Sequence, residues 1–236
     1  MVVILLTNID NAMPMGVIHL AMKRIEKKTF VNYLGLLGVV SMLSYVVAMC
    51  FAPLAYPGYS WLAQAVSDLS AESAPSRTLW NQLSALYAPC AIVCCTVCCV
   101  AVQGHLNKET RLGVYMFSAM NWISAVGFAM FPLTGAGLPS GFQNVMHLVV
   151  TALVVLLSIA SLVLFIVGSG RNGGIRSLGV WAAIALVSML IGGLGVNIVP
   201  LEYFGLVERF STLSVVAFTA VLGMYLFAGS LEGEGC

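Results

Sequence analysis

Residues 142–167 read FQNVMHLVVTALVVLLSIASLVLFIV, a run without one charged side chain. At 1.5 Å per residue, a helix of this length extends about 39 Å, more than the roughly 30 Å apolar core of a bilayer. Its most polar residues, Gln143, Asn144 and His147, stand at the start, before a predominantly apolar stretch rich in valine and leucine. The segment therefore predicts a membrane-spanning helix with polar groups close to one membrane surface.

The composition of the whole chain extends this prediction. Of 236 residues, 60% are hydrophobic and 8% are charged, whereas soluble domains carry about 25% charged residues. Five more apolar segments are long enough to span a bilayer: Phe30–Ala52, Leu79–Val102, Gly113–Phe131, Leu178–Val199 and Phe204–Ala228. We therefore predict an all-α bundle of six transmembrane helices. The net charge of +1 and the lack of a basic stripe argue against a nucleic-acid partner.

The basic residues predict the orientation of the bundle. If the six segments alternate across the membrane, eight of the ten lysines and arginines fall on one side: Lys23, Arg24, Lys27, Lys28, Lys108, Arg111, Arg171 and Arg176. Positively charged loops stay in the cytoplasm, so both termini are expected there. Residues 1–21 are too broken by polar residues to span, and a basic cluster follows them. We expect 1–21 to be a dispensable extension and 22–236 to form the six-helix membrane domain.

With this orientation, the remaining polar residues collect at the outer side. The candidates for binding or chemistry there are Ser67, Asp68, Arg77, Asn81, His147, Asn197, Glu202, Glu208 and Arg209. An ionised side chain is costly inside a span, so Glu208 and Arg209, near the start of the sixth segment, require partners. One interpretation is a set of interfacial ion pairs that join helix ends, such as Arg209 with Asp68 or Glu202. The other is a polar cavity that opens to the outside.

The histidine and cysteine patterns do not predict a metal centre or a cofactor. His147 shares a helix face with Gln143 and Asn144, while His19 and His105 fall on the cytoplasmic side. A neutral imidazole can act as a base, but it is also a common packing residue. The cysteines of the second segment fit small-residue helix packing better than metal binding. We expect no disulfide framework.

The long linker after the first segment has its own periodicity. Apolar residues recur at helical spacing from Trp61 to Leu69, after a suitable N-cap at Ser60. This pattern predicts a short amphipathic helix in the first outer loop. Such a helix would lie on the bilayer surface or fold over the bundle as a lid with Ser67 and Asp68 toward the opening.

Several of these motifs resemble one known family. They are Pro57-Gly58-Tyr59-Ser60, Val66-Ser67-Asp68-Leu69-Ser70-Ala71, Ala74-Pro75, Leu79-Trp80-Asn81, Phe131-Pro132, His147 and Gly205-Leu206-Val207-Glu208-Arg209. Their order and spacing resemble the bacterial membrane proteins grouped as domain of unknown function 998. The resemblance implies a multi-pass protein of the bacterial plasma membrane. A fainter likeness links the chain to eukaryotic six-helix families of lipid-anchor remodelling and autophagy modulation.

Three functions follow as hypotheses. The first is an outward-facing cavity that binds a membrane lipid or other amphiphile and, as an enzyme, uses Asp68, His147 and Glu208 for acid–base chemistry. Ser67, Arg77, Asn81, Asn197, Glu202 and Arg209 would then contact the substrate. The second is a small proton-coupled transporter, although the inner halves of the spans carry almost no charge. The third is a non-catalytic scaffold or sensor. The sequence leaves the oligomeric state open.

Overall fold

The computed structural model describes residues 28–135, 141–171 and 173–232, and within these ranges the regular structure is entirely helical. The expectation for residues 1–21 lies outside the described residues. The elements are α3 (Phe30–Leu34), α4 (Leu36–Phe51), η1 (Ala52–Ala55), η2 (Ser67–Ser70), α5 (Arg77–Leu83), α6 (Tyr87–Ala101), α7 (Lys108–Met130), α8 (Gly141–Ser169), α9 (Arg176–Gly195), η3 (Leu201–Tyr203) and α10 (Phe204–Phe227).

Six helical segments in the described chain are long and apolar enough to cross a membrane. They are Phe30–Ala55, Arg77–Ala101, Lys108–Met130, Gly141–Ser169, Arg176–Gly195 and Leu201–Phe227. Each overlaps one predicted span, and the boundaries differ by a few residues. Large apolar side chains such as Leu156 and Val163 of α8 stay exposed on the outer surface. Because water would penalise such a surface, lipid must solvate it, and the six-helix prediction is confirmed.

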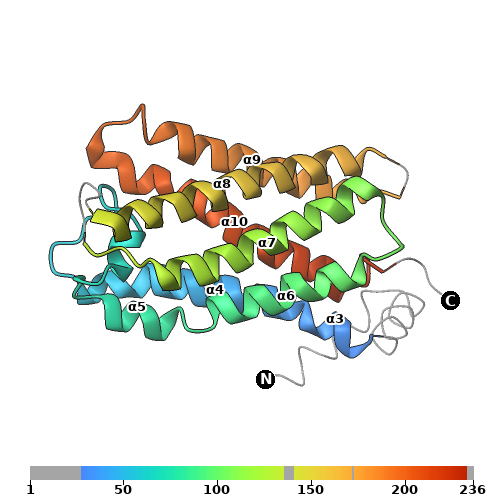
Figure 1. Cartoon of the computed structure of the whole chain (residues 1–236), viewed down its shortest axis with the longest axis horizontal. Coiled ribbons are helices and arrows are strands. Elements are labelled where there is room, and N and C mark those ends of the chain that lie inside the picture. The colour runs from blue at the N-terminus through green and yellow to red at the C-terminus, as the bar shows by residue number, and fades with distance from the viewer. Residues whose placement is uncertain (1–27, 136–140, 172, 233–236) are drawn as a thin grey trace, which may run out of the picture.

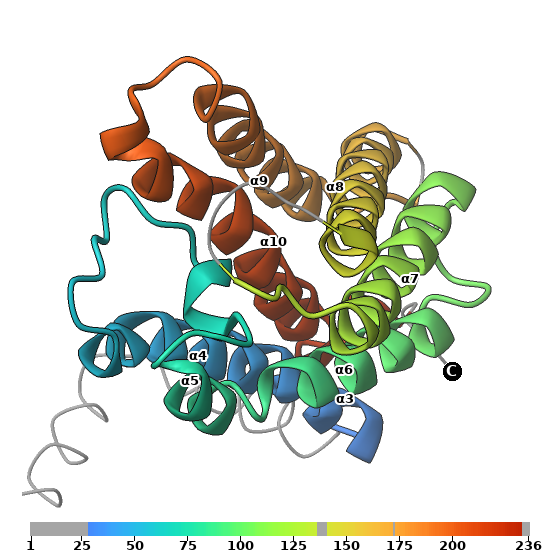
Figure 2. The same cartoon turned by 60° about the vertical axis from the view of Figure 1, so that its left-hand side comes forward.

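The six spans form a closed ring. Going around it, α4 packs on α6, α6 on α7, α7 on α8, α8 on α9, α9 on α10 and α10 on α4. Figure 1 shows α10 crossing the bundle diagonally, and Figure 2 shows it between α4 and α9 at the end that comes forward. The described chain begins and ends at the opposite end. We call the end that carries residues 56–76, 131–135 and 196–203 the loop end.

Glycines bring α10 close to the first span near the chain termini. A Cβ on Gly223 would collide with the carbonyl oxygen of Gly35, and a Cβ on Gly38 with that of Thr219. The neighbouring core is fully packed and includes the buried thiols of Cys94, Cys95 and Cys98 as well as Phe218. The sequence-based interpretation of these cysteines as packing residues agrees with this position. Helix α10 is therefore held tightly near the termini and leans toward α9 at the loop end.

The second span is interrupted between α5 and α6. Pro89 explains the break, since its ring lacks an amide hydrogen and would clash with the carbonyl of Ala85 in a continuous helix. Two serines of α4 satisfy main-chain oxygens around the break: Ser44 Oγ donates to Leu83 O at 2.7 Å and Ser41 Oγ to Tyr87 O at 2.8 Å. The two serines therefore bind the carbonyls of Leu83 and Tyr87 on either side of the break, where α5 ends and α6 begins.

Residues 56–76, here called the lid, fold over the bundle. Val66 and Leu69 are buried against Tyr45 and Trp80, so the lid packs on protein at these two residues. The regular helix expected from Ser60 is reduced to the single 3₁₀ turn η2. Carbonyl oxygens that would accept helical hydrogen bonds are bound instead by Arg209, Leu206 and Tyr59, namely those of Trp61, Leu62, Gln64 and Ala65.

Candidate functional site

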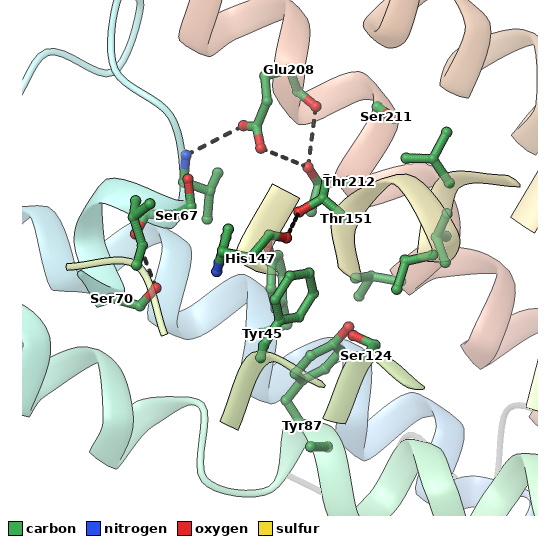
Figure 3. A pocket seen from close by; sticks show the side chains of 18 of the residues that line it. Tyr45, Ser67, Ser70, Tyr87, Ser124, His147, Thr151, Glu208, Ser211 and Thr212 are labelled. Atoms are coloured by element: carbon green, nitrogen blue, oxygen red, sulfur yellow. Dashed lines mark hydrogen bonds between the residues drawn. The ribbon is translucent and has the colours of Figure 1, made fainter. Parts of the chain in front are cut away.

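A cavity of about 660 Å³ lies inside the bundle at the loop end. All six spans and the lid contribute to its wall. Figure 3 labels ten of the lining residues that it draws, and these ten come from α4, the lid, α6, α7, α8 and α10. The lining residues with polar side chains are Tyr45, Ser67, Ser70, Arg77, Asn81, Tyr87, Ser124, His147, Thr151, Ser158, Glu208, Ser211 and Thr212.

Helix α8 carries His147 and forms hydrogen bonds with residues 131–134, the segment that follows α7. Because Pro132 ends α7, the carbonyl of Phe131 lacks a helical partner, and it lies 2.9 Å from His147 Nδ1. A carbonyl oxygen can only accept, so Nδ1 carries a proton, and in the neutral imidazole Nε2 keeps its lone pair. Asn144 Oδ1 accepts from the amide and the hydroxyl of Thr134, both at 3.0 Å. The imidazole is thereby held in a fixed tautomer with one nitrogen available.

Helix α10 carries Glu208 along the opposite side of the cavity. One carboxylate oxygen accepts from the amide of Val66 in the lid at 3.3 Å, and the other from the hydroxyl of Thr212 at 3.1 Å. Figure 3 shows both contacts as dashed lines from Glu208. Glu208 forms no ion pair among the described residues, whose ion pairs are Arg77–Glu72 at 3.9 Å and Arg171–Glu109 at 2.8 Å.

Arg209 points away from the cavity into the lid. It is 3% exposed, and its Nη1 donates to the carbonyl oxygens of Trp61 at 2.8 Å and Gln64 at 3.1 Å. Its Nη2 donates to the Tyr59 hydroxyl at 2.7 Å, and its guanidinium carbon lies 4.3 Å from the Trp61 ring centroid. The suggested ion pairs of Arg209 with Asp68 or Glu202 are absent from the described structure. Carbonyl oxygens take their place.

The remaining sequence-predicted residues divide into two groups. Ser67, Arg77 and Asn81 line the cavity with His147 and Glu208. Asp68, Asn197, Glu202 and Arg209 are outside the lining. Asp68 is half-buried on η2, and burial raises the pKa of its carboxyl above the ordinary value. Asn197 and Glu202 are exposed on the segment between α9 and α10.

Sequence reasoning missed the hydroxyl groups of the cavity wall. Thr151 lies one turn after His147, and Thr212 one turn after Glu208, so each pair shares a helix face. That spacing could have identified them. Tyr45 and Tyr87 could not be found in this way, because they approach the cavity from different helices.

The fold and the distribution of its apolar surface define a multi-pass α-helical membrane protein. A family model described as a protein of unknown function, DUF998, matches residues 39–225, and the chain belongs to this family. This confirms the resemblance stated from the sequence motifs. Neither the curated proteins nor the solved structures contain a match to the chain.

Proposed function

We propose that the protein binds a membrane amphiphile in this cavity, with the head group at the loop end and an apolar chain directed into the bundle. The observation that carries the proposal is the polarity of the wall along its depth. Ser67, Arg77, Asn81, His147 and Glu208 gather near the loop end. Farther along the spans the wall is formed largely by Met120, Val154, Val155, Met189 and Val215. An amphiphile has the same change in polarity along its length, from a polar head group to an apolar chain.

The dimensions of the cavity suit such a ligand. On α8 the lining extends from His147 to Ser158, which corresponds to about 16 Å along a helix. This is roughly half of the 30 Å apolar core of a bilayer, the depth of one leaflet. Pockets of about 300–1,000 Å³ enclose most of a drug-sized ligand, and 660 Å³ falls within this range.

The floor of the cavity favours a binder over a carrier. Met120 and Met189 belong both to the cavity wall and to the packed core, which continues toward the termini through Phe117, Phe165 and Phe218. A transported polar solute would have to cross this apolar layer. A ligand that enters and leaves on the same side of the membrane would not have to cross it.

The placement of the basic residues supports an outward-facing cavity in a bacterial plasma membrane. Lys28, Lys108, Arg111, Arg171 and Arg176 lie at the end opposite the lid. By the positive-inside rule that end is cytoplasmic, so the cavity faces the outer leaflet.

Tryptophan quenching in nanodiscs tests the binding proposal. Trp80 lines the cavity, whereas Trp122 is 47% exposed on the outer surface of the bundle. One variant retains Trp80 and one retains Trp122, with phenylalanine at the other tryptophan positions. Phospholipids brominated near the head-group end of the chain should quench Trp80 saturably at a low mole fraction. Quenching of Trp122 should instead rise in proportion to the brominated lipid.

A variant with a filled cavity supplies the control for this experiment. Val155→Phe adds bulk to the wall, so it should abolish saturable quenching of Trp80 and leave quenching of Trp122 unchanged. Identical behaviour of the two tryptophans in the parent chain would refute the proposal, as would a Val155→Phe variant that quenches like its parent.

Acid–base catalysis on the bound amphiphile is the second candidate function. The position of His147 favours it, because the imidazole lines the same cavity as the carboxylate of Glu208, and its Nε2, when unprotonated, could serve as a base there. His147→Asn should keep the contact with Phe131 O through its amide but remove this base. If lipid products detected by mass spectrometry disappear in this variant while quenching of Trp80 persists, the protein is catalytic. If neither form makes a product, binding is its function.

A further inference from the structure

Four hydroxyl groups in the cavity wall, those of Ser70, Thr151, Ser158 and Thr212, present lone pairs, because their protons are already used. A serine or threonine hydroxyl has a single hydrogen to donate. Three of them donate it to main-chain carbonyls: Ser70 to Ser67 O at 3.0 Å, Thr151 to His147 O at 2.9 Å and Ser158 to Val154 O at 2.7 Å. The single hydrogen of Thr212 is shared between Glu208 O at 3.2 Å and the Glu208 carboxylate at 3.1 Å. A ligand meets acceptors at these positions.

Two stronger acceptors lie among these hydroxyls. In the neutral imidazole, His147 Nε2 has a lone pair, since Nδ1 donates to Phe131 O. The carboxylate of Glu208 has two contacts, with the Val66 amide and the Thr212 hydroxyl, and about four lone-pair positions. This wall of the cavity therefore needs hydrogen-bond donors from its ligand.

The charges at the loop end point to a cation. Four acidic residues lie there, namely Asp68, Glu72, Glu202 and Glu208, against the two basic residues Arg77 and Arg209. Arg209 is committed to the lid carbonyls, and no described cation lies within ion-pair distance of Glu208. A partly buried carboxylate without a close counter-charge is unfavourable, and a cation from the ligand would remove that cost.

We infer that the cavity selects an amphiphile whose head group carries a protonated primary amine, with the ammonium placed between Glu208 and His147 Nε2. This inference rests on the proposed binding function and names its ligand class. Arg77 lines the same cavity, and its 3.9 Å pair with Glu72 is loose and about half exposed. It is available for the phosphate of an aminophospholipid.

The Trp80 quenching assay tests the inference when it is repeated with brominated lipids that differ only in their head group. Phosphatidylethanolamine and phosphatidylcholine have the same net charge, but the quaternary ammonium of choline has no N–H to donate. Phosphatidylglycerol offers hydroxyl donors without a cation. With matched chains, the ethanolamine lipid should half-saturate Trp80 quenching at a mole fraction about tenfold lower than the other two, as one charge-assisted hydrogen bond predicts.

Two variants and one matched control identify the residues responsible. Glu208→Gln and His147→Asn should each reduce the preference for the ethanolamine lipid over the choline lipid about tenfold. Both variants should still bind the choline lipid, which shows that their fold is intact. Glu202→Gln, an exposed acid at the same end and outside the cavity, should leave the preference unchanged. Equal or tighter binding of choline or glycerol lipids in the parent chain would overturn the amine inference alone. Absence of saturable quenching by all three lipids would overturn the binding proposal itself.

Discussion

At the scale of single residues, adjacent charges on α10 have different tasks. Glu208 lines the cavity, whereas Arg209 is buried and binds the lid through main-chain oxygens. Neighbouring helical residues point about 100° apart, so one turn of α10 can serve the cavity and the lid separately. An arginine suits the second task because its planar fork carries five N–H donors.

Removing the guanidinium of Arg209 should destabilise the lid. Arg209→Met leaves the oxygens of Trp61 and Gln64 without their donor, and we expect a loss of about 3 kcal/mol in the free energy of unfolding. Thermal unfolding measures the loss, and amide hydrogen exchange should accelerate within residues 59–66. Arg77→Met is the control, since its half-exposed 3.9 Å pair is worth less than about 1 kcal/mol. Equal effects of the two substitutions would contradict this role for Arg209.

The carboxyl group of Asp68 should make stability depend on pH. Burial raises its pKa because desolvation disfavours the charged form, so the folded state holds this proton more tightly than the unfolded chain. Its stabilising contribution is complete below the ordinary value of 3.8 and is lost as pH rises through the folded pKa. Asp68→Asn should therefore melt at a higher temperature than the parent at neutral pH.

Melting curves at a series of pH values provide the measurement for Asp68. The difference between Asp68→Asn and the parent should shrink as the pH falls toward 3.8. Glu202→Gln, at an exposed position, serves as the control substitution. A difference that stays constant over the whole pH range would show that titration of Asp68 is not its cause.

At the scale of helices, small residues and one proline determine where the bundle closes and where it opens. Gly35 and Gly223 allow α10 to approach the first span near the termini, and Pro89 separates α5 from α6 nearer the loop end. The two features together place tight packing at one end and the cavity at the other. Both depend on missing atoms: a Cβ in the glycines and an amide hydrogen in the proline.

The glycine contact yields a matched pair of substitutions. In Gly223→Ala the new Cβ collides with the main-chain oxygen of Gly35, which cannot move independently, so we expect a loss of about 2 kcal/mol. In Gly193→Ala the new Cβ meets no atom, and the better helix propensity of alanine should leave stability equal or up to about 1 kcal/mol higher. Unfolding midpoints in detergent measure both. A destabilised Gly193→Ala and an unchanged Gly223→Ala would contradict the packing argument.

At the scale of the whole molecule, six spans place both ends of the described chain on one side and the cavity on the other. The lid is joined to α10 through Leu206 and Arg209, and to the corner after α7 through Glu72 and Ser73. The lid therefore ties separate helices together over the cavity. Entry of an amphiphile between helices from the lipid would leave these contacts intact.

Reporter fusions test the orientation that the cavity proposal assumes. Alkaline phosphatase is active only where its disulfides form, outside the cytoplasm, whereas the common green fluorescent reporters fluoresce inside it. A phosphatase fused after Leu201 should be active, and one fused after Arg171 inactive. A fluorescent protein fused to the C-terminus should fluoresce. The reverse pattern at all three positions would place the cavity on the cytoplasmic side.

Sequence reasoning found most of the architecture, and the six spans and the packed cysteines agree with it. Of the residues proposed for the site, Ser67, Arg77, Asn81, His147 and Glu208 line the cavity, and their roles stay predictions. One of its two interpretations paired Arg209 with Asp68 or Glu202, and it predicted a longer helix in the lid. Both differences from the structure have one cause, since the carbonyls that bind Arg209 are the ones a regular lid helix would have used.

The sequence by itself determined the number and position of the spans. In lipid every main-chain polar group must be bonded within its own helix, so a count of consecutive apolar residues is enough. Only the tertiary structure decided which polar groups meet. The contact of Arg209 with the lid and that of His147 with Phe131 join separate elements, and they depend on how each helix is rotated and tilted. Such packing arises from all six helices together, so no single stretch of sequence encodes it.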